Sequence, residues 1–373
     1  ELLDRARPVA AAWQAQAAEA DRAGHPAPEA VKALRASGLT GLSVPRGAGG
    51  LGASLAETAV VMECLGRADA SLALILGMTL QVAGSVAEEG TLPPAVVSRL
   101  LAIAARGGLV NSAASEPEMG SPSHGGAYAT RAERAPGGWR LTGRKTWVTG
   151  APLLDAALVP ASAGADAWTF LVELPAEGAR VDTGAAGPGL ALRASASLDL
   201  VLDGVFVPEA LAAPPRPPSR PGGPPWFMTV VAAVYLGVGW AALDALRDYA
   251  WERVPSAYGR PIATLPKVRQ AAGRMALRLS AARALLRQAT VNGADRALLG
   301  AAKVAAVEAA VSSTDLAVQA AGAAALSARL PLERLFRDAR AGLFNPPGEE
   351  AALERLAAAV LDEPVEETGP PGS

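Results

Sequence analysis

Two stretches of the sequence place small hydroxyl side chains near a tryptophan. The first ends in a polar turn that contains Ser115 and Ser121, and the second ends in a run that contains Trp147 and Thr149. Hydroxyl groups can hydrogen-bond to the polar edge of a planar heteroaromatic ligand, and an indole can pack against its apolar face. The pattern predicts a site for such a ligand, with a tryptophan buried in the protein core as the alternative.

The elements that position these residues follow from the periodicity of the chain. Short alternating runs bounded by glycine and proline predict strands over residues 108–210, in a middle β-sandwich or barrel domain. Apolar spacings of three and four predict an N-terminal helical domain over residues 1–107 and a C-terminal helical bundle over residues 226–362. The Pro-rich segment 211–225 is expected to be a linker and the acidic tail 363–373 to be disordered. The fold class is therefore α+β.

Composition excludes several classes of function. The formal net charge is −2 and the charges are interspersed, so no basic face for nucleic acid is expected. The chain has a single cysteine, Cys64, and its first residues lack a secretory pattern, which predicts a cytoplasmic protein without disulfides. Only two histidines, His25 and His124, are present, so no metal site is expected.

One stretch, Trp226 to Leu243, has eighteen uncharged residues, which is the threshold length for a membrane span. Gly237 and Gly239 interrupt it and charged residues follow at once, and we find no second stretch of this kind. The interpretation is a buried core helix and no membrane.

The two hydroxyl-bearing stretches resemble the flavin-facing segments of the acyl-CoA dehydrogenase family. Residues 115–121 are similar to its T-E-P-x-x-G-S-D pattern and residues 143–150 to its G-x-K-x-W-I-T-N pattern. Residues 38–52 resemble a glycine-rich loop of the same family, and the helix that follows is predicted to begin with a capping box of Ser54 and Glu57. The resemblance implies an N-terminal helical domain, a middle β domain and a C-terminal four-helix bundle.

The resemblance also implies how a flavin ring would be held. Ser115 and Thr149 would contact the ring by hydrogen bonds, and Trp147 would pack against it. Ser121, in the same segment as Ser115, is a further expected cofactor-binding residue. FAD is the expected cofactor, with FMN as the alternative. A small-molecule substrate, which in the family is a CoA thioester, would bind beside the flavin.

The remaining parts of the cofactor site would come from a neighbouring subunit. Arg253 matches an arginine that in the family reaches the FAD pyrophosphate, and Arg269 is a rival phosphate ligand. Gln319 and Gly322 resemble a turn that contacts the adenine half of FAD, although only one of that turn's three glycines remains. A shared cofactor site implies a homodimer or homotetramer.

The family's catalytic base is absent from its expected position. In the family this glutamate comes nine residues after the arginine of an Arg-Asp-Ala motif; here that arginine is Arg337 and the position is Pro346. The weak candidates for a catalytic role are Asn345, which could orient a substrate, and Glu349 and Glu350, which a shifted loop could present.

Three functions remain open at this point. The first is an FAD-dependent oxidoreductase that acts on an acyl-CoA-like or other small organic substrate, paired with an electron-transferring flavoprotein. The second is a monooxygenase that receives reduced flavin from a flavin reductase. The third is a non-catalytic flavin-binding relative. Losing a positioned base lowers a rate by about 10² to 10⁴, so the usual α,β-desaturation is in doubt.

Overall fold

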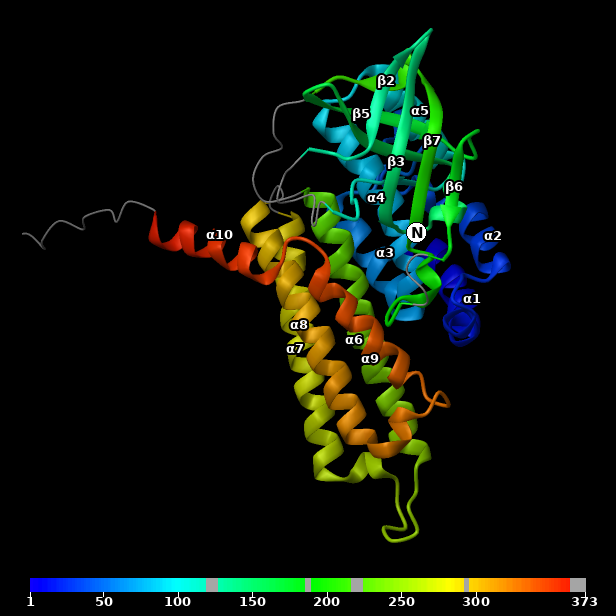
Figure 1. The fold of residues 1–373 in the computed structure, drawn as a ribbon. Helices are drawn as coiled ribbons and strands as arrows, with labels where there is room; N and C mark the ends of the chain where they lie inside the picture. Colours follow the sequence, from blue (N-terminus) through cyan, green and yellow to red (C-terminus); the bar gives the residue numbers. More distant parts are fainter. Residues whose placement is uncertain (119–126, 185–188, 216–223, 292–294, 363–373) are drawn as a thin grey trace, which may run out of the picture.

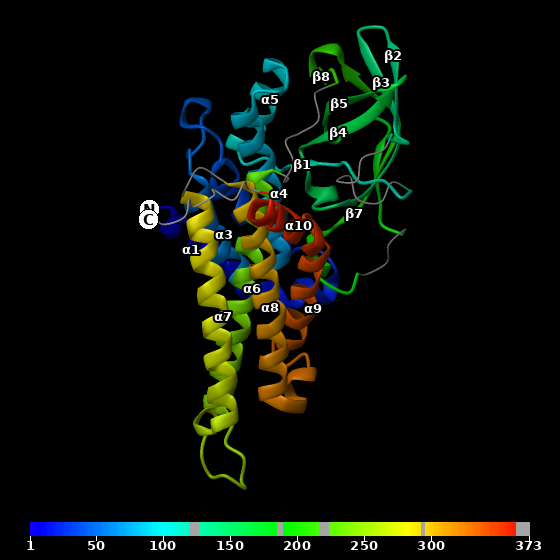
Figure 2. The same ribbon diagram turned by 90° about the vertical axis from the view of Figure 1, so that its left-hand side faces the viewer.

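The structure is a computed structural model that describes residues 1–118, 127–184, 189–215, 224–291 and 295–362. A group of N-terminal helices lies between a twisted sheet and a bundle of long helices (Figure 1). Turned by 90°, the bundle extends well below the sheet, and α10 crosses near its upper end (Figure 2). The predicted α+β architecture is confirmed.

The N-terminal part consists of helices separated by short loops. They are α1 (Leu2–Ala23), α2 (Pro28–Ala36), α3 (Leu55–Ala68), α4 (Ala70–Glu89) and α5 (Pro94–Ala105). The predicted capping box is present at the start of α3. The Glu57 amide donates to Ser54 Oγ at 3.3 Å, and the Glu57 carboxylate accepts from the Ser54 amide at 2.9 Å. This reciprocal pair satisfies two amides that the helix itself leaves free.

The middle part is a mixed sheet. Its strands are β1 (Val110–Ser112), β2 (Arg131–Ala135), β3 (Gly138–Val148), β4 (Ala156–Ala163), β5 (Asp166–Glu173), β6 (Ala179–Asp182), β7 (Leu198–Pro208) and β8 (Ala212–Ala213). They follow the order β6-β7-β3-β2-β4-β5-β8, with β1 parallel to β4. The long antiparallel pair β3 and β7 shifts register twice, the second time between Lys145 and Val148. Such a bulge turns side chains out of the regular alternation.

The C-terminal part is built on four packed helices, three of them long, and a fifth that leaves them. They are α6 (Pro225–Glu252), α7 (Pro266–Val291), α8 (Arg296–Ala321), α9 (Leu332–Ala341) and α10 (Glu349–Leu361). The first four pack along one another as a bundle, and α10 projects from its upper end (Figure 1). The predicted four-helix bundle is therefore present.

The apolar stretch from Trp226 lies in α6, and 78% of its most apolar window is buried, as expected for a core helix. The expectation that no other stretch is comparable was wrong. Among the described residues α4 and α8 also have the length and hydropathy of a membrane span, with 83% and 56% of those windows buried. Because α4 packs against other elements on all sides, its sequence lacks the polar face that would mark it as a surface helix.

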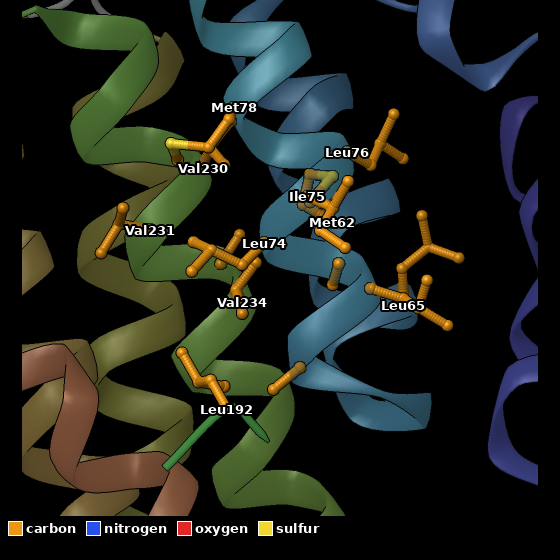
Figure 3. Packing of buried hydrophobic residues seen from close by; sticks show 14 of the residues in the cluster. Met62, Leu65, Leu74, Ile75, Leu76, Met78, Leu192, Val230, Val231 and Val234 are labelled. Atoms are coloured by element: carbon orange, nitrogen blue, oxygen red, sulfur yellow. The ribbon is translucent and has the colours of Figure 1, made fainter. Parts of the chain in front are cut away.

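Close approach of α6 to α3 and α4 forms the centre of the core. A Cβ added at Gly84 would lie 2.3 Å from the Trp226 ring, and one at Gly66 would lie 2.6 Å from the Val234 carbonyl oxygen. Side chains such as Leu74 and Val230 interdigitate between these helices (Figure 3). Glycine is required at these two crossings because any larger residue would separate the helices.

Three parts of the chain meet at two consecutive residues of α9. The Arg337 guanidinium binds the Asp21 carboxylate of α1 at 2.7 Å and the Leu190 carbonyl oxygen at 3.0 Å. The next residue, Asp338, accepts a hydrogen bond from the Leu192 amide at 2.7 Å. The Arg-Asp pair of the sequence motif thus ties the bundle to the N-terminal helices and to the middle domain.

Burial raises the pKa of Asp338 to about 7; Arg334 opposes this shift, whereas Asp21 and Asp69 reinforce it. Between the ordinary value of 3.8 and about 7 the folded protein therefore binds more protons than the unfolded chain. The contribution of Asp338 to the free energy of unfolding is complete below pH 3.8 and is lost as the pH rises through 7.

Asp338→Asn is expected to flatten the dependence of stability on pH between about 4 and 7. The amide cannot ionise, and its carbonyl oxygen still accepts from the Leu192 amide. Urea unfolding at several pH values measures the effect, with Asp166→Asn, at an exposed position of β5, as the control that keeps the wild-type slope. An unchanged slope in Asp338→Asn would contradict the assignment.

Candidate functional site

Ser115 and the residue after it are both bonded to β3. Its carbonyl oxygen accepts a hydrogen bond from the Thr146 amide at 2.9 Å. The next residue, Glu116, binds the Lys145 ammonium at 2.6 Å, in a pair whose side chains are 2% and 0% exposed. Two consecutive links therefore hold the Ser115 turn against the residues that precede Trp147.

Both members of the Glu116–Lys145 pair make further hydrogen bonds. The Glu116 carboxylate also accepts from the amides of Ala129 at 2.6 Å and Thr130 at 3.0 Å, and Lys145 donates to the Pro160 carbonyl oxygen at 2.6 Å. Although burial opposes ionisation of Glu116, its bonds to Lys145 and Thr130 hold its pKa below the usual range. Burial lowers the pKa of Lys145, and Glu116 opposes that shift. Removing one partner of such a pair would leave an uncompensated buried charge.

Trp147 lies in the bulge of β3 with a φ of +55° and is 66% exposed. A bulky residue in the left-handed region is uncommon, and such conformations concentrate at functional sites. Among the described residues the indole has no ring or cation partner. The exposed position of Trp147 is therefore consistent with the prediction of an indole that a ligand can reach. It is not consistent with the alternative of a tryptophan buried in the core.

Thr149 follows the bulge and is nearly buried. Its hydroxyl shares a hydrogen bond of 3.0 Å with Ser197 Oγ, and its carbonyl oxygen accepts from the Asn111 side chain at 3.0 Å. The structure thus brings Ser115, Trp147 and Thr149 to one edge of the middle domain. Ser121, the fourth predicted residue of this group, lies outside the described residues.

Arg253 lies at the far end of the bundle, where it caps α6 with extended backbone. It lines a hollow of about 400 Å³ together with Lys267 and with residues 320, 321, 323 and 324. Gly322 lies within that segment, at a φ of +71° and a ψ of −154° that only glycine adopts readily. Gln319, three residues before Gly322, is exposed and does not line the hollow. The structure therefore brings Arg253 and the segment around Gly322 to one hollow.

Lys267 was not anticipated from the sequence. It is the second residue of α7, next to Pro266, and such a position gives no periodic signal. Arg269, which the sequence raised as a rival phosphate ligand, does not line the hollow. The hollow thus has two cations, Arg253 and Lys267, and the small side chains of the α8 end on its opposite wall.

The weak catalytic candidates lie in the loop between α9 and α10 and in the first turn of α10. Asn345 is half-buried, whereas Glu349 and Glu350 are exposed in the first turn of α10, where acidic side chains favour the positive end of the helix. Stabilisation of the α10 N-terminus is therefore enough to explain why these two carboxylates lie there. Among the described residues no cluster of histidine, cysteine or carboxylate side chains could hold a metal ion.

Comparison with known proteins agrees with this arrangement. Sequence profiles of the acyl-CoA dehydrogenase N-terminal, middle and C-terminal domains match residues 1–93, 111–205 and 229–360. The chain belongs to the acyl-CoA dehydrogenase family, whose members are flavin oxidoreductases. The resemblance found in the sequence is confirmed over nearly the whole chain.

Individual relatives differ in what their names say they do. "Putative acyl-CoA dehydrogenase YdbM" of Bacillus subtilis is 34% identical over 97% of this chain and 97% of its own. The 3-sulfinopropanoyl-CoA desulfinase of Paraburkholderia xenovorans is 30% identical over 92% and 90%. The crystal structure of KijD3 with FMN and a dTDP-amino-keto sugar is 27% identical, with a TM-score of 0.80 and coverage of 97% and 93%.

Proposed function

We propose that this protein is a flavin-dependent oxidoreductase whose flavin ring lies against Trp147, with Ser115 and Thr149 at its polar edge. The observation that carries the proposal is an exposed indole at a positive φ, beside two hydroxyls and anchored by a buried ion pair. This donor set fits a flavin, which would supply hydride or oxygen chemistry when bound. The chain's own residues would orient the ring and cover one of its faces.

A CoA thioester is the substrate class we favour. Two relatives of at least 30% identity that cover nine-tenths or more of this chain are named for reactions of CoA thioesters. The absence of a base at Pro346 weighs against ordinary desaturation and leaves a monooxygenase as the second candidate. The similarity to KijD3, whose structure contains FMN and a sugar nucleotide, supports a substrate other than a CoA thioester in that case. The electron partner would be an electron-transferring flavoprotein in the first case and a flavin reductase in the second.

We also propose that the active form is a cytoplasmic homodimer or homotetramer. Helix α6 has 28 residues, a length of about 42 Å. It begins near the sheet and ends at the Arg253 hollow, so the two predicted halves of the cofactor site lie far apart within one chain (Figure 1). A second copy that brings its hollow to the Trp147 edge would complete the site.

The test is an anaerobic titration of the flavin-loaded protein with acyl-CoA thioesters of different chain length, followed by the flavin absorption band. Bleaching on mixing would support acyl-CoA oxidation. A fully loaded flavin that no thioester bleaches would reject desaturation and favour the monooxygenase. A protein that takes up no flavin at all would contradict the proposed function.

Arg253→Ala is expected to weaken FAD binding by about tenfold and to leave FMN binding unchanged, because only FAD has the second phosphate and the adenine to reach the hollow. Equilibrium titration of the apoprotein with each flavin measures both affinities. Arg269→Ala, outside the hollow, is the matched control. Equal losses for FAD and FMN would assign Arg253 to the fold instead.

A further inference from the structure

Two buried side chains of the bundle hold the loop that carries Asn345. The Lys303 ammonium, on α8 and 2% exposed, donates to the carbonyl oxygens of Gly342 at 3.0 Å, Asn345 at 2.5 Å and Pro347 at 3.0 Å. All three donors of the ammonium are thereby used. Burial lowers the pKa of Lys303 to about 8, so the ammonium form still predominates at pH 7. The main chain of the loop is fixed by these bonds.

The side chain of Asn345 is fixed separately by Tyr235 of α6. The Tyr235 hydroxyl donates to Asn345 Oδ1 at 2.9 Å. Tyr235 is fully buried, and among the described residues this is the hydroxyl's one partner. If the amide were turned over, Nδ2 would donate to the hydroxyl, whose own proton would then have no acceptor. A buried unsatisfied donor costs about 1–3 kcal/mol, so the Oδ1 orientation is favoured.

The consequence is that the Nδ2 group of Asn345 is left for another partner. Within the described part of the chain Nδ2 has no hydrogen-bond partner, and it is not among the buried unsatisfied atoms, so solvent or a ligand can reach it. An amide nitrogen only donates hydrogen bonds. The residue next to the expected base position therefore offers two N–H donors, while its Oδ1 already accepts from Tyr235.

We propose that Asn345, held by Tyr235 and Lys303, donates a hydrogen bond to the thioester carbonyl oxygen of the substrate. Tyr235 and Lys303 are positioning residues, because they act through Asn345. The proposal rests on the proposed function. It assigns a hydrogen-bond donor, in place of a base, to this part of the loop. A base would remove a proton from the substrate, whereas a donor stabilises negative charge on the carbonyl oxygen.

The experiment compares two ligands that differ by that oxygen, butyryl-CoA and its thioether analogue S-butyl-CoA. Calorimetric titration of the flavin-loaded full-length protein gives a dissociation constant for each. Asn345→Ala is expected to weaken butyryl-CoA binding by about 5–10-fold and to leave the thioether unchanged. Asn345→Asp, which has no N–H to donate at pH 7, is expected to weaken the thioester at least as much.

Tyr235→Phe separates the positioning role from contact with the ligand. It removes one hydroxyl from a buried site and frees the amide to turn, so it should lower the thioester-to-thioether preference while Asn345 remains. Tyr258→Phe, at an exposed position, is the control that keeps the wild-type preference. Thermal unfolding of each variant verifies that the fold persists.

The outcomes separate this proposal from the function on which it rests. An equal loss of both ligands, or no loss, in Asn345→Ala would overturn the donor role and leave the proposed function intact. Failure of the loaded wild-type protein to bind either ligand would reject the CoA substrate class, and the donor role with it. Loss of the thioester preference alone would support both.

Discussion

Pro346→Glu is expected to raise the rate of flavin reduction by an acyl-CoA thioester by about 10² to 10⁴, the usual worth of a positioned base. Position 346 lies nine residues after Arg337, where the family places its catalytic glutamate, and Pro346 is exposed, so a longer side chain has room. Stopped-flow mixing of the flavin-loaded variant with butyryl-CoA, without oxygen, measures the rate from the loss of flavin absorption.

The matched control is Pro346→Gln, which has the same shape without the ability to accept a proton. It should reduce flavin no faster than the wild type. If the glutamate and glutamine variants reduce flavin equally fast, the gain comes from the loss of proline. If neither variant exceeds the wild type, the 342–347 loop does not face the reacting carbon.

Lys145→Met is expected to lower the free energy of unfolding by about 3–5 kcal/mol, the range for breaking a buried pair by removing one partner. It would leave the Glu116 carboxylate, 2% exposed, without its counter-charge. Because this pair holds the Ser115 turn against β3, the variant should also lose flavin during gel filtration. Urea unfolding and the ratio of flavin to protein absorbance measure the two effects.

The double variant Glu116→Gln/Lys145→Met removes both charges and should regain part of the lost stability. Arg7→Met is the control from a surface pair, because Arg7 and Asp4 are 67% and 71% exposed. Its cost should not exceed about 1 kcal/mol. If Lys145→Met lowers the free energy of unfolding by no more than this surface control does, the buried pair is not needed for the fold.

The fold could be predicted because its signals are local. Helical spacing, alternating strands and the Pro-rich segment marked the three parts, and Ser54 with Glu57 marked the start of α3. The exception was α4, which has no polar face because other elements surround it. Local periodicity cannot distinguish such a buried helix from a membrane span by composition alone.

The site was only partly predictable from the sequence. Trp147 and Arg253 could be named because neighbouring residues form a recognisable pattern. The side chains that hold the site were missed: Lys145 meets Glu116 across 29 positions, Tyr235 meets Asn345 across 110, and Lys303 meets the same loop across 42. Contacts of this range depend on the packing of whole elements, which a short motif does not encode.

The contact between Asp21 and Arg337 spans 316 positions, and it has a consequence for synthesis of the chain. Ribosomes add about 5–20 residues per second, so α1 leaves the ribosome tens of seconds before its partner arginine is made. During that interval the Asp21 carboxylate has no counter-charge from α9, and the helices that will bury α6 expose apolar faces. The N-terminal helices thus cannot make all of their native contacts until Arg337 has been translated.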